Sequence, residues 1–168
     1  MLKRPRTLKA RALQLLAQRE QSKVELRRKL LAHARAAEAA ASEADVIAPA
    51  SPEAQVDAVL AWLEANRFLS AERFAESRVN ARAGRFGNLR IRHELAQHEV
   101  ALSAEAEQAL VDSELARARA VRARKFSAAP DSVAEHARQA RFLAARGFSS
   151  DAIRRVLREA AKPDRGHA

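Results

Sequence analysis

Apolar residues recur along this chain every three or four positions, beginning with Leu8, Ala12, Leu15 and Leu16. This spacing places the apolar side chains on one face of an α-helix, whereas a strand would need alternation with a period of two. The same spacing returns in later segments, which are separated by capping and turn residues. The pattern therefore predicts an all-α protein built from several short helices.

Capping residues predict where these helices begin. Residues 22–25, Ser-Lys-Val-Glu, form a capping box that opens a helix to about Ala32. Residues 51–53, Ser-Pro-Glu, combine a cap, a proline at the first helical position and an early acid, and predict a helix to about Ala65. Later helices are predicted to begin at Ser70, Asn88, Ser103, Ser132 and Ser149, and the one from Ser103 extends, on its longest interpretation, to Lys125.

A five-residue pattern occurs three times: an aliphatic residue, Arg, then Arg or His, any residue, and Leu. The copies occupy residues 26–30, 91–95 and 153–157, so they are spaced by 65 and 62 residues. A turn residue stands four positions before each copy, namely Ser22, Gly87 and Ser149. This spacing predicts tandem repeats of about 60 residues, each with room for three short helices.

The repeats divide the chain into three units. The first spans residues 1–66 and includes a basic N-terminal tail, the second spans 67–116, and the third spans 117–162. Within the first unit, residues 34–50 are rich in Ala, and we expect a frayed helix end or a disordered insert there. We expect residues 163–168 to form a disordered tail.

Helical geometry assigns a direction to each repeated position. At about 100° per residue, the aliphatic residue and the Leu four positions later define one buried stripe. The second position lies at the edge of that stripe, and the third faces away from it. The edge positions are Arg27, Arg92 and Arg154, and the outward positions are Arg28, His93 and Arg155. Each residue alone could be part of an ordinary solvated face. Their repetition favours a single basic track, in which these side chains together bind one partner.

Composition limits the class of protein. The chain has 168 residues with 41 Ala, 4 Gly, 5 Pro and no Cys, which excludes collagen-like and β-sandwich classes and a disulfide framework. The longest uncharged runs reach seven residues, too short for a signal-peptide core or a membrane span. We therefore expect a soluble, cytoplasmic, helical protein that does not enter the membrane.

The net charge of +10 points to a polyanionic partner or an acidic protein surface. A GC-rich genome would inflate Arg and Ala together, but it would not sort the charge into blocks. The blocks are net +8 over residues 1–33, −5 over 34–66, +4 over 67–95, −5 over 96–116 and +8 over 117–162. This alternation favours a patterned electropositive surface.

Catalytic and cofactor motifs are missing from the sequence. No two of the five His lie three or four residues apart, as a helical metal pair requires, and no nucleophile elbow, Walker sequence or dinucleotide turn is present. Gly84 and Gly87 suit a tight turn, and the alternative of a phosphate-cradling loop lacks the Lys-Ser/Thr that would follow it. We expect no enzymatic activity, cofactor or metal.

Three segments resemble the RecX regulatory proteins, which modulate the bacterial recombinase RecA. The first is residues 16–30, with the run Glu-Leu-Arg-Arg-Lys-Leu. The middle one comprises residues 69–77, with Arg-Phe-Ala-Glu-Ser at 73–77, and residues 84–95, with Gly87 and Arg-Ile-Arg at 90–92. The last is residues 141–149, with Arg-Phe-Leu-Ala-Ala-Arg-Gly-Phe-Ser. The resemblance covers roughly residues 8–160. It departs from the family pattern at 67–71 and 98–100, and in the length of the Ala-rich segment.

The resemblance implies an elongated, curved array of three-helix repeats and a function that is not enzymatic. It also implies a regulator that lies in the groove of the RecA–single-stranded DNA filament, restrains ATP hydrolysis and strand exchange, and so affects the SOS response and DNA repair. We expect the chain to be a monomer. Binding to bare single strands would be weak and non-specific. The alternatives are a helix-turn-helix transcription regulator that reads a specific DNA sequence, and a pure protein scaffold.

The repeated basic positions and their neighbours are the candidate binding residues. They lie on the predicted helices of the repeats or at the turns beside them. The candidates are Arg19, Arg27, Arg28, Lys29, Arg82, Arg85, Arg90, Arg92, Arg146, Arg154 and Arg155.

Overall fold

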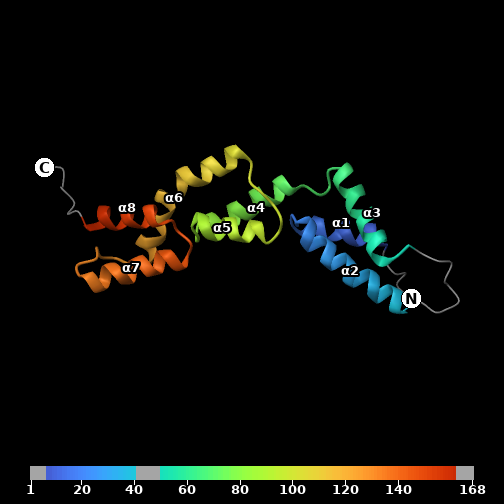
Figure 1. Ribbon diagram of the computed structural model, residues 1–168, viewed down its shortest axis with the longest axis horizontal. Helices are drawn as coiled ribbons and strands as arrows, with labels where there is room; N and C mark the ends of the chain where they lie inside the picture. Colours follow the sequence, from blue (N-terminus) through green and yellow to red (C-terminus); the bar gives the residue numbers. More distant parts are fainter. Residues whose placement is uncertain (1–6, 41–49, 162–168) are drawn as a thin grey trace. The chain divides into compact units, whose positions relative to one another are not determined.

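The computed structural model describes residues 7–40 and 50–161, which form helices and connecting turns without a strand in those ranges. The all-α prediction is therefore confirmed. The predictions for the basic tail, for residues 41–49 of the Ala-rich segment and for residues 163–168 lie outside the described residues. The helices, labelled in Figure 1, are α1 (Leu8–Gln18), α2 (Lys23–Ala40), α3 (Pro52–Ala65), α4 (Ala71–Ala83), α5 (Asn88–Ala96), α6 (Ala104–Lys125), α7 (Val133–Ala145) and α8 (Ser150–Ala161).

The chain forms two compact units. The first comprises the described residues up to Phe74 together with His98–Val100, and the second comprises Ala75–Gln97 and the described residues from Ala101 onward. In the first unit, α1, α2 and α3 pack on one another around Leu26, Leu30, Leu60 and Leu63, which are almost completely buried. Burial of these side chains is the main stabilising contribution to this three-helix unit.

The core of the second unit lies between α6, α7 and α8. Leu143, Phe148, Val156 and Leu157 are buried there against the second half of α6. The turn between α7 and α8 contains Gly147, whose φ of 79° is left-handed and favours glycine, the residue that commonly follows the end of a helix.

The lengths of α2 and α6 test two predictions made from the sequence. The prediction that α2 ends near Ala32 is wrong, because the helix continues to Ala40. Ala is a strong helix former, and Ala34 is buried against the core of the first unit, so packing extends the helix. Residues 104–125 form one continuous helix, which confirms the longest interpretation of the segment that begins at Ser103.

Candidate functional site

The three copies of the repeated pattern lie on α2, α5 and α8. Their aliphatic positions are buried, as the helical spacing predicts. Ser22 and Ser149 cap α2 and α8 by accepting hydrogen bonds from the amides of Glu25, at 3.1 Å, and Ala152, at 3.3 Å. Gly87 occupies the corresponding position before α5 without a side-chain cap. The three helices are therefore locally equivalent.

The outward positions Arg28, His93 and Arg155 are exposed, which confirms their predicted direction. Of the edge positions, Arg27 and Arg92 are half-buried, with 41% of each side chain exposed. Arg154 differs from this prediction, since 70% of its side chain is exposed.

Packing explains why Arg154 differs from the other two edge arginines. Arg27 donates to Asp57 of α3 at 2.8 Å, and Arg92 donates to Glu107 of α6 at 2.7 Å. Each therefore binds an acid on the helix that follows its own. No helix follows α8 in the described part of the chain, and Arg154 meets only Asp151 of its own helix, at 3.5 Å.

Most of the candidate residues already bind a carboxylate. The exposed pairs among them contribute little to stability, whereas the pairs with the buried Glu25 contribute more. In every pair the carboxylate lowers the positive potential that its partner presents to a ligand. The paired candidates are Arg19, Arg27, Lys29, Arg82, Arg90, Arg92, Arg154 and Arg155. Within residues 7–40 and 50–161, the candidates without an ion pair are Arg28, Arg85 and Arg146.

Arg19 and Lys29 hold a structural carboxylate in the first unit. Glu25 is 8% exposed and accepts hydrogen bonds from Arg19 Nη1 at 3.1 Å and from Lys29 Nζ at 2.8 Å. Burial raises the pKa of the Glu25 carboxyl, but the hydrogen bonds and charges of Arg19 and Lys29 outweigh burial and lower this pKa from 4.5 to about 2. Arg19 therefore joins the end of α1 to α2, and Lys29 binds the same carboxylate from within α2.

Arg28 precedes Lys29 on α2 but does not bind Glu25. Its exposed side chain lines a shallow cavity together with Arg27, Arg35 and Glu99. Arg35 binds Glu53 of α3 at 2.7 Å, and Arg27 binds Asp57. Arg28 is thus the basic side chain of this face that is available to an external anion.

In the second unit, three candidates surround the ring of Phe86. The guanidinium carbons of Arg82, Arg85 and Arg90 lie 5.6, 5.9 and 5.4 Å from the centre of that ring. Arg82 and Arg90 also share the carboxylate of Glu94, at 2.9 and 3.4 Å. The attraction between these guanidinium groups and the aromatic ring concentrates positive charge at the turn between α4 and α5.

The turn between α4 and α5 does not cradle a phosphate with its backbone. The amides of Gly87 and Leu89 donate to the carbonyls of Arg146 and Gly147 at 2.9 and 3.0 Å, and the amide of Asn88 donates to Glu114 at 2.9 Å. These donors are therefore occupied within the protein, which supports the tight-turn interpretation of the two glycines.

Glu114 of α6 fixes the starts of two of the repeat helices. Its carboxylate is buried and accepts from the amide of Asn88 at the start of α5, and from the amide and hydroxyl of Ser149 before α8, at 3.2 and 2.7 Å. Arg117, one turn later, donates to the carbonyls of Phe86 and Leu110, both at 2.9 Å. Burial lowers the pKa of Arg117, and the charge of Glu114 opposes this effect.

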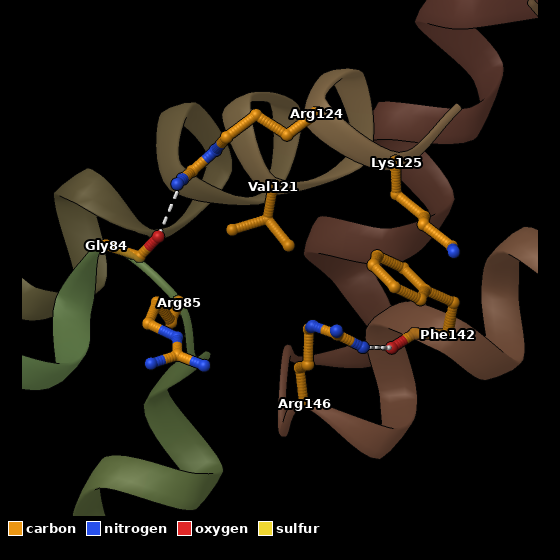
Figure 2. Close-up of a pocket in the computed structure, with 7 residues that line it drawn as sticks. All are labelled: Gly84, Arg85, Val121, Arg124, Lys125, Phe142 and Arg146. Atoms are coloured by element: carbon orange, nitrogen blue, oxygen red, sulfur yellow. Dashed lines mark hydrogen bonds between the residues drawn. The ribbon is translucent and has the colours of Figure 1, made fainter. Parts of the chain in front are cut away.

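A basic cavity lies within the second unit, between the α4–α5 turn and the C-terminal ends of α6 and α7 (Figure 2). It brings together two of the candidates, Arg85 and Arg146. Two further cations, Arg124 and Lys125, line it, and the sequence reasoning did not select them. The signal that could have found them is the group of basic residues in the last turn of α6.

Within residues 7–40 and 50–161, no three His, Cys, Asp or Glu side chains gather as a metal site would require. No helix of the same ranges is long and apolar enough to cross a membrane.

Two family models match adjacent stretches of the chain that cover most of the second unit. The model of the second three-helix domain of RecX matches residues 72–110, and that of the third matches residues 112–157. The junction between the two matches falls inside α6, so this helix completes one three-helix domain and begins the next. The tandem arrangement predicted from the repeats is thereby confirmed for this part of the chain.

Whole-length relatives carry the same family name. The regulatory protein RecX of Ralstonia pickettii (strain 12J) is 41% identical over 157 residues, which cover 92% of this chain and 89% of the relative. That of Herbaspirillum seropedicae is 43% identical over 93% of this chain and 92% of the relative. That of Leptothrix cholodnii (strain ATCC 51168 / LMG 8142 / SP-6) is 44% identical over 90% of this chain and 88% of the relative. This chain therefore belongs to the RecX family of regulatory proteins.

Proposed function

We propose that this chain binds the RecA–single-stranded DNA filament in the cytoplasm and restrains ATP hydrolysis and strand exchange. It would thereby modulate the SOS response and DNA repair, without an enzymatic activity of its own. The observation that carries the proposal is the match to regulatory proteins named RecX along nearly the whole length of both chains. RecA is proposed as the partner because the sequence segments resemble a family that modulates RecA.

The charge of the molecule supports a polyanionic partner. The net charge is +10, and cations such as Arg28 and Arg85 have no carboxylate partner among the described residues. Both features favour contact with phosphates or with acidic side chains. Contacts of this kind do not read bases, so binding to bare single strands would be weak and independent of sequence.

A sequence-specific transcription regulator is less well supported. Base readout in the major groove uses Asn and Gln beside Arg. The repeat helices α2, α5 and α8 contain one such residue, Asn88, which is buried and holds Arg117. The outward faces of these helices therefore lack amide side chains for reading bases.

The proposal is tested by titrating the purified chain into RecA assembled on single-stranded DNA with ATP. We expect binding to the filament, and a fall in ATP hydrolysis and strand exchange at less than one copy per RecA. Unchanged hydrolysis over the whole titration, with binding confirmed, would show that the proposed regulation is wrong. A footprint confined to one DNA sequence would favour the transcription regulator instead.

Double variants test whether the outward repeat positions act. Replacing Arg28 and Arg155 with Ala is expected to weaken filament binding by about one to two powers of ten, with little change in stability, because both side chains are exposed and Ala favours helix. The control replaces Arg35 and Arg165, which lie outside the three five-residue copies and carry the same total charge. Arg35 is already paired with Glu53 in the folded chain. Equal losses in both double variants would mean that total charge, rather than position, governs binding.

A further inference from the structure

The cavity of the second unit is basic on several sides at once. Arg85 comes from the α4–α5 turn, Arg124 and Lys125 from the end of α6, and Arg146 from the end of α7 (Figure 2). Gly84, Val121 and Phe142 complete the lining, so no acid takes part in it. Residues from three separate segments thus line one small cavity.

None of these four cations is in an ion pair with another of the described residues, in contrast to Arg82 or Arg92 nearby. Like charges that share a cavity repel one another, and a bound anion would relieve this repulsion. The cavity therefore has an electrostatic preference for an anionic ligand.

Local contacts hold two of the guanidinium groups in place. Arg124 donates from Nη2 to the carbonyl of Gly84 at 2.6 Å and from Nε to the carbonyl of Ala120 at 3.2 Å. Arg146 lies over the ring of Phe142, 3.7 Å from its centre, and donates to the carbonyl of the same residue at 3.4 Å. A guanidinium has more N–H donors than these contacts use, so both groups are oriented and can still bind a ligand.

The shape and lining of the cavity select the kind of anion. Its volume is about 230 Å³, below the ~300–1,000 Å³ of typical small-molecule pockets, which suits one compact group. Arg146 covers the ring of Phe142, so a nucleic-acid base would find no open aromatic face there. A phosphate offers oxygen acceptors to several guanidinium groups at once, whereas one arginine fork already satisfies a carboxylate.

We propose that this cavity is a subsite for one backbone phosphate of single-stranded DNA, bound by Arg85, Arg124, Lys125 and Arg146. This inference rests on the nucleic-acid part of the proposed function and adds the position and chemistry of one contact. Because the contact is to a phosphodiester, it fixes the position of the strand on the second unit without reading its sequence.

The test compares two double variants of the full chain that remove equal charge. Arg85→Ala with Lys125→Ala changes the cavity, and neither side chain makes a hydrogen bond that holds the fold within the described ranges. Arg141→Ala with Arg158→Ala removes two exposed arginines of the same unit that do not line the cavity. Circular dichroism and the thermal midpoint verify that both variants are folded.

The measurement is fluorescence anisotropy with a labelled oligo(dT) over a series of salt concentrations. The cavity variant is expected to bind about tenfold more weakly than the unmodified chain, and the control less than about twofold. The dependence of log Kd on log salt is expected to lose roughly 0.7 per phosphate contact removed. Equal weakening in both variants would overturn the subsite, as would an unchanged salt dependence.

Binding to the RecA filament separates this inference from the proposed function. If the cavity variant loses filament binding but keeps its affinity for oligo(dT), the cavity binds an acidic protein surface and the phosphate subsite is wrong. If the unmodified chain does not bind the filament, but its affinity for oligo(dT) depends on the cavity residues, the subsite stands and the proposed function fails. A fall in the thermal midpoint of the cavity variant without a change in affinity would overturn the subsite and would show that Arg85 and Lys125 contribute only to stability.

Discussion

Replacing Glu114 with Ala should destabilise the second unit more than any surface change. Its buried carboxylate joins α6 to the start of α5 through Asn88 and to the start of α8 through Ser149. Both helix starts present backbone amides with partial positive charge, and one carboxylate serves them together. The variant therefore leaves both helices without the acceptor that positions them.

The expected loss follows from the hydrogen bonds involved. Three donors, the amides of Asn88 and Ser149 and the Ser149 hydroxyl, lose their acceptor. Hydrogen bonds to a charged group contribute about 1.5–3 kcal/mol each, and some of this loss is recovered where water enters the space. We expect a net loss of about 3–5 kcal/mol, a large part of the ~5–15 kcal/mol that stabilises a typical protein. Glu114→Gln keeps one oxygen and should lose about half as much.

Urea and thermal unfolding followed by circular dichroism measure this loss. A loss of about 3 kcal/mol corresponds to a fall of roughly 6–12 °C in the thermal midpoint for a chain of this size class. The control is Glu107→Ala, which removes the partly exposed partner of Arg92 and should cost at most about 1 kcal/mol. If Glu114→Ala is no less stable than Glu107→Ala, the carboxylate does not hold α5 and α8 as described. Hydrogen exchange at the amides of Asn88 and Ser149 locates the effect.

Three further predictions concern stability and binding. Because the pKa of Glu25 is about 2 in the folded chain and 4.5 when unfolded, its contribution of up to about 3 kcal/mol is present above pH 4.5 and lost as the pH falls towards 2. In urea unfolding, the stability difference between the unmodified chain and Glu25→Gln should therefore shrink over that range, and a constant difference would contradict the pKa. Gly87→Ala should cost about 1–3 kcal/mol or more, since its Cβ would lie 2.3 Å from the backbone of Gly147 and Phe148. Gly84→Ala is the control, because nothing lies within 4 Å of its Cβ, and equal thermal midpoints would disprove the close approach. Affinity for bare oligo(dT) should fall steeply between ~50 and ~200 mM salt, and an unchanged affinity would exclude phosphate contacts.

Local signals in the sequence determined the helices and the direction of their side chains. Ser22 and Ser149 cap the helices that they were expected to open, and Gly147 has the left-handed backbone that ends α7. Arg28 and Arg155 face outward as helical periodicity requires. These features depend on residues within a turn or two of one another, so a single sequence contains the information that specifies them.

The partner of each arginine depended on the tertiary structure. Arg27 and Arg28 are neighbours in sequence, but packing places Asp57 of α3 against the first and leaves the second exposed. In the same way, Arg92 is neutralised by Glu107, while Arg85 and Arg146 line a cavity with cations from α6. Periodicity gives the direction of a side chain from its own helix, but it does not specify which distant segment lies opposite. The packing of the helices decides that, and it separates arginines that bind a carboxylate of the fold from those that can bind a phosphate.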